Sequence, residues 1–230
     1  MQLKTTHATF TGIDPVSIHN IAERLRGISF GMNSEVHVTG ADVDNNTLSV
    51  EIITRKEREV PMFDEDKGVL IREMQFKYSS LFFTLNMDTN IAQTYGGARD
   101  FAVLADVCKA AGCELMIEPL CIDLKAWSDA LLEAQNTAQF AGCVIQKHYS
   151  DNLIGQFNAK SIDNRLHDDM LTGQTVKSMK FSYYHYDVRV AVEVRNDATI
   201  TVSCSEDESL DQMHREHVAL MLSNVIKAGE

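Results

Sequence analysis

Apolar and polar residues alternate in short runs along most of the chain, and this period of two is typical of half-buried strands. In the run 188–194, for example, valine occupies every second position. The pattern predicts strands at residues 3–10, 35–39, 47–53, 69–78, 81–87, 114–120, 143–149, 153–157, 176–186, 188–194 and 199–203. We expect loops at residues 55–67, which are mainly charged, and at 159–173, which are polar.

Other segments carry apolar residues at the three- and four-residue spacing of a helix face. Asp14 stands directly before Pro15, and Asp123 precedes a segment with Trp127 and Leu131. Aspartate is a preferred N-cap residue, and proline is well tolerated at the first helical position. The spacing predicts helices at 14–27, 98–111 and 123–136, and a last helix that follows a capping box at 205–208 and reaches about residue 227.

The order of elements occurs twice, and several residues match between the two passes. Residues 71–78 (IREMQFKY) align without a gap with residues 176–183 (VKSMKFSY). The predicted closing helices also match, at residues 104–110 and 222–228. We therefore expect an α+β fold built from an internally duplicated unit, in which each copy is an antiparallel β-sheet with helices packed on one face.

The chain length and the scarcity of proline set the expected domain organisation. With 230 residues and three prolines, the chain offers few candidates for a flexible linker. Copies of about 115 residues can each bury a modest core. We expect a first repeat at residues 1–112 and a second at 113–230, fused into one body without a linker.

The apolar runs and the cysteine spacing bear on where in the cell the protein is expected. No run approaches the ~18 apolar residues of a membrane-spanning helix, and no secretory signal is visible at the start. The five cysteines form no C-x-x-C pair, so we expect reduced and mostly buried thiols. These features predict a cytoplasmic protein with no membrane partner and no cofactor.

The formal net charge of −12 repels phosphate at long range, so a nucleic-acid binder of this composition needs a local basic surface. Aromatic and basic residues do interleave on the matched strands. Rings that stack bases and cations that contact phosphates are what single-stranded nucleic acid requires. The sequence therefore predicts a non-catalytic protein that binds RNA or single-stranded DNA on these strands. The candidate residues are Lys77, Tyr78, Lys180, Tyr184, His185, Tyr186 and Arg189.

The repeated order of several strands followed by a helix resembles the architecture of the Whirly and PUR-type single-strand binders. The resemblance lies in element order only. Both copies here also differ from these families in beginning with an additional strand and helix. It implies a protein that binds single-stranded nucleic acid.

Two alternatives remain open. The first is a protein-binding or self-assembling structural component, with a protein partner or a homo-oligomer. The second is an enzyme of unrecognised type, although the chain has no nucleophile elbow, P-loop, dinucleotide fingerprint or zinc-protease motif. For that enzyme, His214 and His217 lie three residues apart on a predicted helix, with Asp211 one turn earlier, and are the candidate metal ligands.

Overall fold

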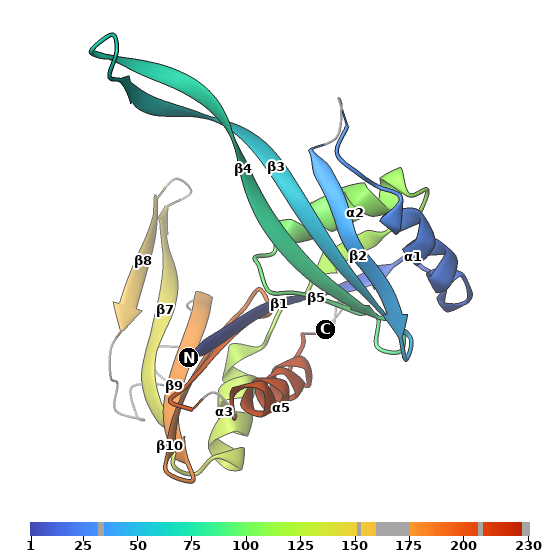
Figure 1. Cartoon of the computed structure of the whole chain (residues 1–230). Helices are drawn as coiled ribbons and strands as arrows, with labels where there is room; N and C mark the ends of the chain where they lie inside the picture. The colour runs from blue at the N-terminus through green and yellow to red at the C-terminus, as the bar shows by residue number, and fades with distance from the viewer. Residues whose placement is uncertain (32–34, 151–152, 160–174, 207–208, 227–230) are drawn as a thin grey trace. The chain divides into compact units, whose positions relative to one another are not determined.

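The computed structural model describes residues 1–31, 35–150, 153–159, 175–206 and 209–226. The chain has an α+β fold with an antiparallel sheet and four α-helices in the described residues (Figure 1). Hydrogen bonds link ten strands in the order β2-β3-β4-β5-β1-β11-β10-β9-β7-β8, and an eleventh strand, β6, pairs with β1. The predicted α+β class and antiparallel pairing are confirmed.

The chain divides into two compact units, each discontinuous in sequence. Unit 1 comprises residues 1–9, 95–98 and 118–230, and unit 2 comprises residues 10–94 and 99–117. Strand β1 (Gln2–Thr11) contributes to both units. The expected boundary at residue 112 stays a prediction.

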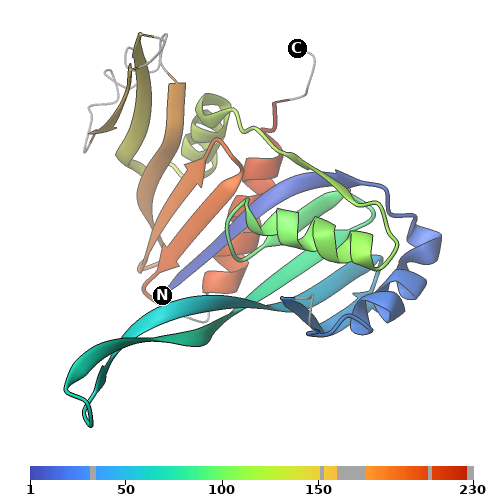
Figure 2. The ribbon, with the colours of Figure 1, turned by 90° about the horizontal axis from the view of Figure 1, so that it is seen from above.

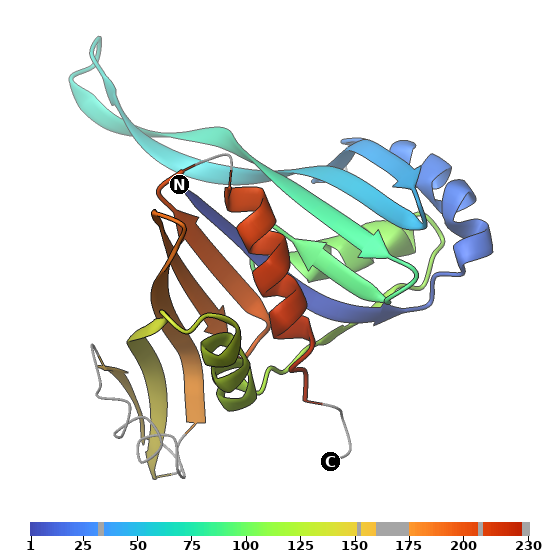
Figure 3. The same cartoon turned by 90° about the horizontal axis from the view of Figure 1, so that it is seen from below.

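Unit 1 has two helices against one face of its strands (Figure 3). Apolar residues at alternate positions of the strands point toward these helices, and the ring of Trp127 in α3 lies 5.7 Å from that of Phe181 in β9. Asp123 caps α3, as predicted, by accepting hydrogen bonds from the backbone N–H groups of Lys125 and Ala126. The elements are α3 (Leu124–Ala134), β7 (Gln139–Ser150), β8 (Leu153–Ala159), β9 (Thr175–His185), β10 (Val188–Arg195), β11 (Thr199–Cys204) and α5 (Leu210–Leu222), and β6 (Met116–Pro119) contributes to both units.

Unit 2 packs its helices against the strands in the same way. Helix α2 lies across the strands (Figure 2), and its Phe101 ring is 6.1 Å from that of Phe83. Asp14 caps the turn before α1 by accepting a hydrogen bond from the backbone N–H of Val16, as predicted. The elements are η1 (Pro15–Ser17), α1 (Ile18–Arg26), β2 (Val36–Asp44), β3 (Thr47–Asp64), β4 (Val69–Asn86), β5 (Ile91–Thr94) and α2 (Asp100–Ala110).

The prediction of a loop at residues 55–67 is wrong. Strand β3 continues to Asp64, and β4 begins at Val69, so residues 55–64 pair in register with 69–78 as a two-stranded ribbon. We call residues 55–78 the arm (Figure 1). Residues 55–59 are all charged, and both faces of the arm are exposed. The sequence therefore has no row of buried apolar residues at alternate positions from which this strand could be predicted.

The expected internal duplication is not evident in the structure, which has a single sheet. The order strand, helix, strands, helix does occur twice. The matched segments nevertheless occupy unlike positions: residues 71–78 lie on the exposed arm, whereas residues 176–183 lie on a strand paired on both sides, with β7 and β10. Met74 and Phe76 are exposed, while Met179 and Phe181 are buried. Both segments alternate because both are strands, and the shared residues serve different environments.

The remaining expectations about composition can be placed on the fold. All five cysteines are free thiols; Cys121 is exposed and the other four are buried. Among the described residues, no helix is both long and apolar enough to cross a membrane. The expected loop at 159–173, apart from its first residue, and part of the capping box at 205–208 lie outside the described residues.

Candidate functional site

The strands of unit 1 present two unlike faces. On β10, Val190, Val192 and Val194 are buried toward the helices, and the residues between them point the opposite way. We call that second surface the open face. It carries small, polar and charged side chains that are exposed or half-buried: Lys180, Ser182, Tyr184, Arg189, Ala191, Glu193, Arg195, Thr201 and Ser203.

A groove of about 480 Å³ crosses the open face where three neighbouring strands carry small residues. Ala191 of β10 lies in register with Ser182 of β9 on one side and with Ser203 of β11 on the other. Lys180 and Arg189 line the groove beside this floor. None of the described lining residues is acidic, so the groove is locally basic on a chain with a net charge of −12.

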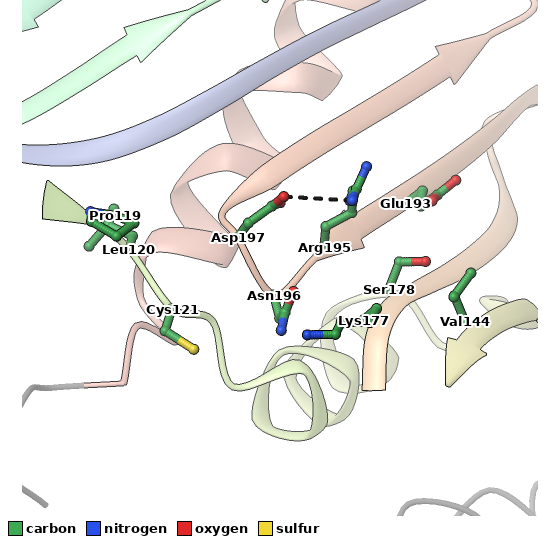
Figure 4. Close-up of a pocket in the computed structure, with 10 residues that line it drawn as sticks. All are labelled: Pro119, Leu120, Cys121, Val144, Lys177, Ser178, Glu193, Arg195, Asn196 and Asp197. Carbon is green, nitrogen blue, oxygen red and sulfur yellow. Dashed lines mark ion pairs between the residues drawn. The ribbon is translucent and has the colours of Figure 1, made fainter. Parts of the chain in front are cut away.

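A second hollow of about 660 Å³ lies on unit 1 near the opposite ends of β9 and β10 (Figure 4). Lys177 and Arg195 contribute its cations, and Glu193 and Asp197 its carboxylates. Arg195 forms an ion pair with Asp197, with 3.7 Å between Nη2 and Oδ2. This hollow is therefore less basic than the groove.

Tyr184 stands at the edge of the groove. It lies in register with Arg189, and 64% of its surface is exposed. His185 and Tyr186 follow at the end of β9, where their rings meet edge to face at 4.6 Å. Tyr186, in the turn after β9, has a positive φ of 44°, which is uncommon for a bulky residue, and is exposed. The structure thus brings Lys180, Tyr184 and Arg189 together, with His185 and Tyr186 beside them.

Lys77 and Tyr78 are not part of this surface, because they belong to the arm of unit 2. Tyr78 contacts Phe30 edge to face, with 6.1 Å between the ring centroids. Lys77 lies opposite Lys56 on the other face of the arm. These two candidates therefore lie in a different unit from the other five, and their part in binding stays a prediction.

His214 and His217 lie in the covered layer between α5 and the strands. A hydrogen bond of 2.9 Å joins His214 Nε2 to the hydroxyl of Thr5, and one of 2.6 Å joins His217 Nε2 to the hydroxyl of Tyr183. Burial lowers the pKa of each histidine to about 4, with smaller contributions from neighbouring ionisable groups. Both rings are therefore neutral at pH 7 and bridge helix to strand.

The two histidines do not converge on a common point with Asp211. Their Nε2 atoms are engaged by hydroxyls on two different strands, β1 and β9. Across the part of the chain that the structure describes, no cluster of three or more His, Cys, Asp or Glu side chains is placed to hold a metal ion.

Sequence reasoning missed several residues of this surface, among them Ser182, Ala191, Arg195, Ser203 and Ser205. The signal was present, because Arg189, Ala191, Glu193 and Arg195 alternate with buried valines and so must share a face. What the sequence does not reveal is the lateral register that places Ser182, Ala191 and Ser203 side by side.

No protein-family model matches the chain, and no curated protein matches it either. Its function therefore has to be inferred from its residues and their geometry.

Proposed function

We propose that the chain binds single-stranded nucleic acid along the open face of unit 1. The observation that carries this proposal is the groove beside Lys180 and Arg189, whose described lining residues include no carboxylate. Lysine and arginine contact phosphates, and serine hydroxyls add neutral hydrogen bonds to phosphate oxygens. The serines available for this are Ser182, Ser203 and Ser205.

A polymer fits this surface better than a single small anion does. Arg189 and Arg195 lie six residues apart on β10, which corresponds to about 20 Å along a strand. Lys180 lies between them on the neighbouring strand, in register with Glu193. The cations are thus spread along a row rather than converging on one point, as successive phosphates of a chain require.

Tyr184 favours a single strand over a duplex. Its exposed ring lies beside Arg189 and can stack on an unpaired base, an interaction worth about 1–3 kcal/mol per base. Stacking is not weakened by the negative charge of the protein. The paired bases of a duplex are stacked on each other and offer no free face to this ring.

The buried histidines do not support the enzyme alternative. Each is a hydrogen-bonded member of the helix–strand layer, and neither lines the groove or the second hollow. We therefore assign no catalytic residue.

A titration of a fluorescent 20-nucleotide single strand, followed by anisotropy, tests the proposal. The wild-type chain should bind, and the variant Lys180→Ala with Arg189→Ala should bind at least tenfold more weakly because two phosphate contacts are lost. The matched control is Lys56→Ala with Lys77→Ala, which removes the same charge from the arm. No binding at tens of micromolar, or an equal loss in both variants, would contradict the proposal.

A further inference from the structure

The arm of unit 2 exposes an unusual amount of apolar surface. On one of its faces, Leu70 is 71% exposed, Phe63 60%, Met74 56%, Tyr78 56% and Phe76 50%. Cross-strand partners share a face, so the register of β3 and β4 assigns these residues to five successive pairs. From base to tip the pairs are Arg55 with Tyr78, Glu57 with Phe76, Glu59 with Met74, Pro61 with Arg72, and Phe63 with Leu70. We call this surface the apolar arm face.

Charge distinguishes between possible occupants of the apolar arm face. Residues 55–78 contain six basic and six acidic side chains, so the arm is neutral although the whole chain carries −12. A neutral surface gives little counterion release, which disfavours nucleic acid. The turn at the tip contains Asp64, Glu65 and Asp66, which disfavours insertion of the tip at an anionic membrane surface. A protein surface of balanced charge fits better.

We propose that the apolar arm face binds the same face of a second copy of this chain, in a two-fold dimer with the arms antiparallel. The two-fold axis runs perpendicular to the strands through the central pair, Glu59 and Met74. Strand β3 then faces β3 of the second copy, and β4 faces its β4. The pair nearest the base then meets the pair nearest the tip. Such isologous pairing is the commonest form of homo-oligomer.

The pairs are complementary in this arrangement. Tyr78 meets Leu70 of the second copy, and Arg55 meets its Phe63. Within its own chain Arg55 already lies 4.9 Å from the ring centroids of Phe30 and Phe76, so the second copy adds a further ring to an existing cation–π contact. Phe76 meets Arg72 of the second copy, so aromatic rings lie opposite guanidinium groups in two places on each half of the interface. At the centre Met74 meets Met74, and Glu59 meets Glu59 of the second copy. Each Glu59 accepts an ion-pair hydrogen bond of 3.1 Å from Arg72 of its own chain, which offsets the repulsion between the two carboxylates.

The parallel arrangement is less favourable for two reasons. It superposes β3 on β4 of the second copy, so the carboxylate of Glu57 would face the ring of Phe76. It also brings the bases of both arms to the same end, where two strongly negative bodies would lie close together. The antiparallel arrangement separates the bodies by the length of the arms.

The dimer should be weak. The face spans nine residues of each strand, about 27 Å, and only two strands in width. That is less than the roughly 800 Å² per partner of a standard interface. We therefore expect a weak association that forms the dimer at high local concentration.

Sedimentation equilibrium from about 5 to 300 μM, without nucleic acid, measures the association. The wild type should pass from monomer to dimer, and Leu70→Ser with Phe76→Ser should shift the midpoint at least tenfold upward. The matched control is Met62→Ser with Ile71→Ser, an apolar cross-strand pair on the opposite face of the arm, which should dimerise normally. Because all four side chains are exposed, neither variant should unfold the chain. A wild type that stays monomeric over the whole concentration range overturns the proposal. The apolar arm face would then be a surface for a different protein.

Cysteine crosslinking tests the antiparallel register. In a Cys121→Ser background, which removes the one exposed native thiol, Met74→Cys should give a covalent dimer with a bismaleimide that spans about 10 Å, the spacing of stacked sheet faces. The neighbouring Gln75→Cys, on the other face, should not. Equal crosslinking at both positions, or none at Met74→Cys where sedimentation shows a dimer, would overturn this arrangement. Neither readout depends on the nucleic-acid surface of unit 1.

Discussion

The hydroxyl of Tyr183 and Nε2 of His217 lie 2.6 Å apart, in the layer between β9 and α5. Both side chains are almost fully buried. Burial raises the pKa of Tyr183 to about 12 and lowers that of His217 to about 4. Both side chains are therefore uncharged at pH 7. Together with the bond between Thr5 and His214, their hydrogen bond fixes α5 on the strands opposite the open face.

The buried histidines predict a stability that falls with acid. Their pKa is about 4 in the folded chain and near 6.5 in the unfolded chain, so between these values the unfolded state binds more protons. The free energy of unfolding should therefore decrease as pH falls from 7 toward 4, by at most about 1.4 kcal/mol per pH unit for each histidine. Urea unfolding at pH 7, 6 and 5 measures this.

Two variants separate this effect from ordinary acid denaturation. His217→Gln, which cannot titrate, should reduce the slope between pH 7 and 5, whereas the exposed His19→Gln should leave it unchanged. Equal slopes in the wild type and His217→Gln would mean that His217 is not buried neutral in the folded chain.

Thiol reactivity should follow burial. Cys121 is exposed and should react with a thiol reagent within minutes at pH 8. The other four thiols are buried and should react only when the chain unfolds. Cys108 should be the slowest, because burial and the nearby Cys113 raise its pKa to about 12. Mass spectrometry of partially labelled protein identifies the modified residue. Rapid labelling of Cys108 in the folded chain would contradict the packing of α2.

Much of the fold was predictable because local patterns carry it. The caps at Asp14 and Asp123 and the valine alternation of β10 depend on neighbouring residues, and these elements appear where expected. The strand at 69–78 was expected, but its partner at 55–64 was missed because an exposed ribbon has no buried row of apolar residues to reveal its period. The duplication was expected because the segments around Met74 and Met179 share an alternating pattern. Met74 is exposed on the arm and Met179 is buried, so the shared pattern reflects strand structure and not equivalent positions.

The candidate site was predictable only in part. Lys180, Tyr184 and Arg189 lie within ten residues of each other, so a single hairpin brings them together. The groove floor depends on β11, which is placed beside β10 by pairing that the residue types alone do not specify. Lys77 and Tyr78 were included because aromatic and basic residues interleave on that strand too, and this local pattern does not determine which unit a strand enters.

Filling the groove without changing its charge should weaken binding. Ala191→Leu adds bulk to the groove floor between Ser182 and Ser203, so a phosphate could approach Lys180 and Arg189 less closely. We expect at least a fivefold loss of affinity for the 20-nucleotide strand. Ala191 is half-buried on the open face, so thermal unfolding should change little. Unchanged affinity would place the ligand outside the groove.

The exposed ring of Tyr184 should contribute stacking. Tyr184→Ala should weaken binding about tenfold, within the range expected for one stacked base. Tyr78→Ala is the matched control, since Tyr78 is similarly exposed but belongs to the arm. If Tyr78→Ala weakens binding as much as Tyr184→Ala does, the ligand contacts the arm and not the open face alone.

The salt dependence of binding tests the central claim most directly. For a single strand, the logarithm of the association constant falls against the logarithm of salt concentration with a slope of about −0.7 per phosphate contact. Measured from 50 to 200 mM salt, the wild type should show a steep negative slope, and Lys180→Ala with Arg189→Ala should be shallower by about 1.4. The same slope in both proteins would contradict phosphate binding at the groove.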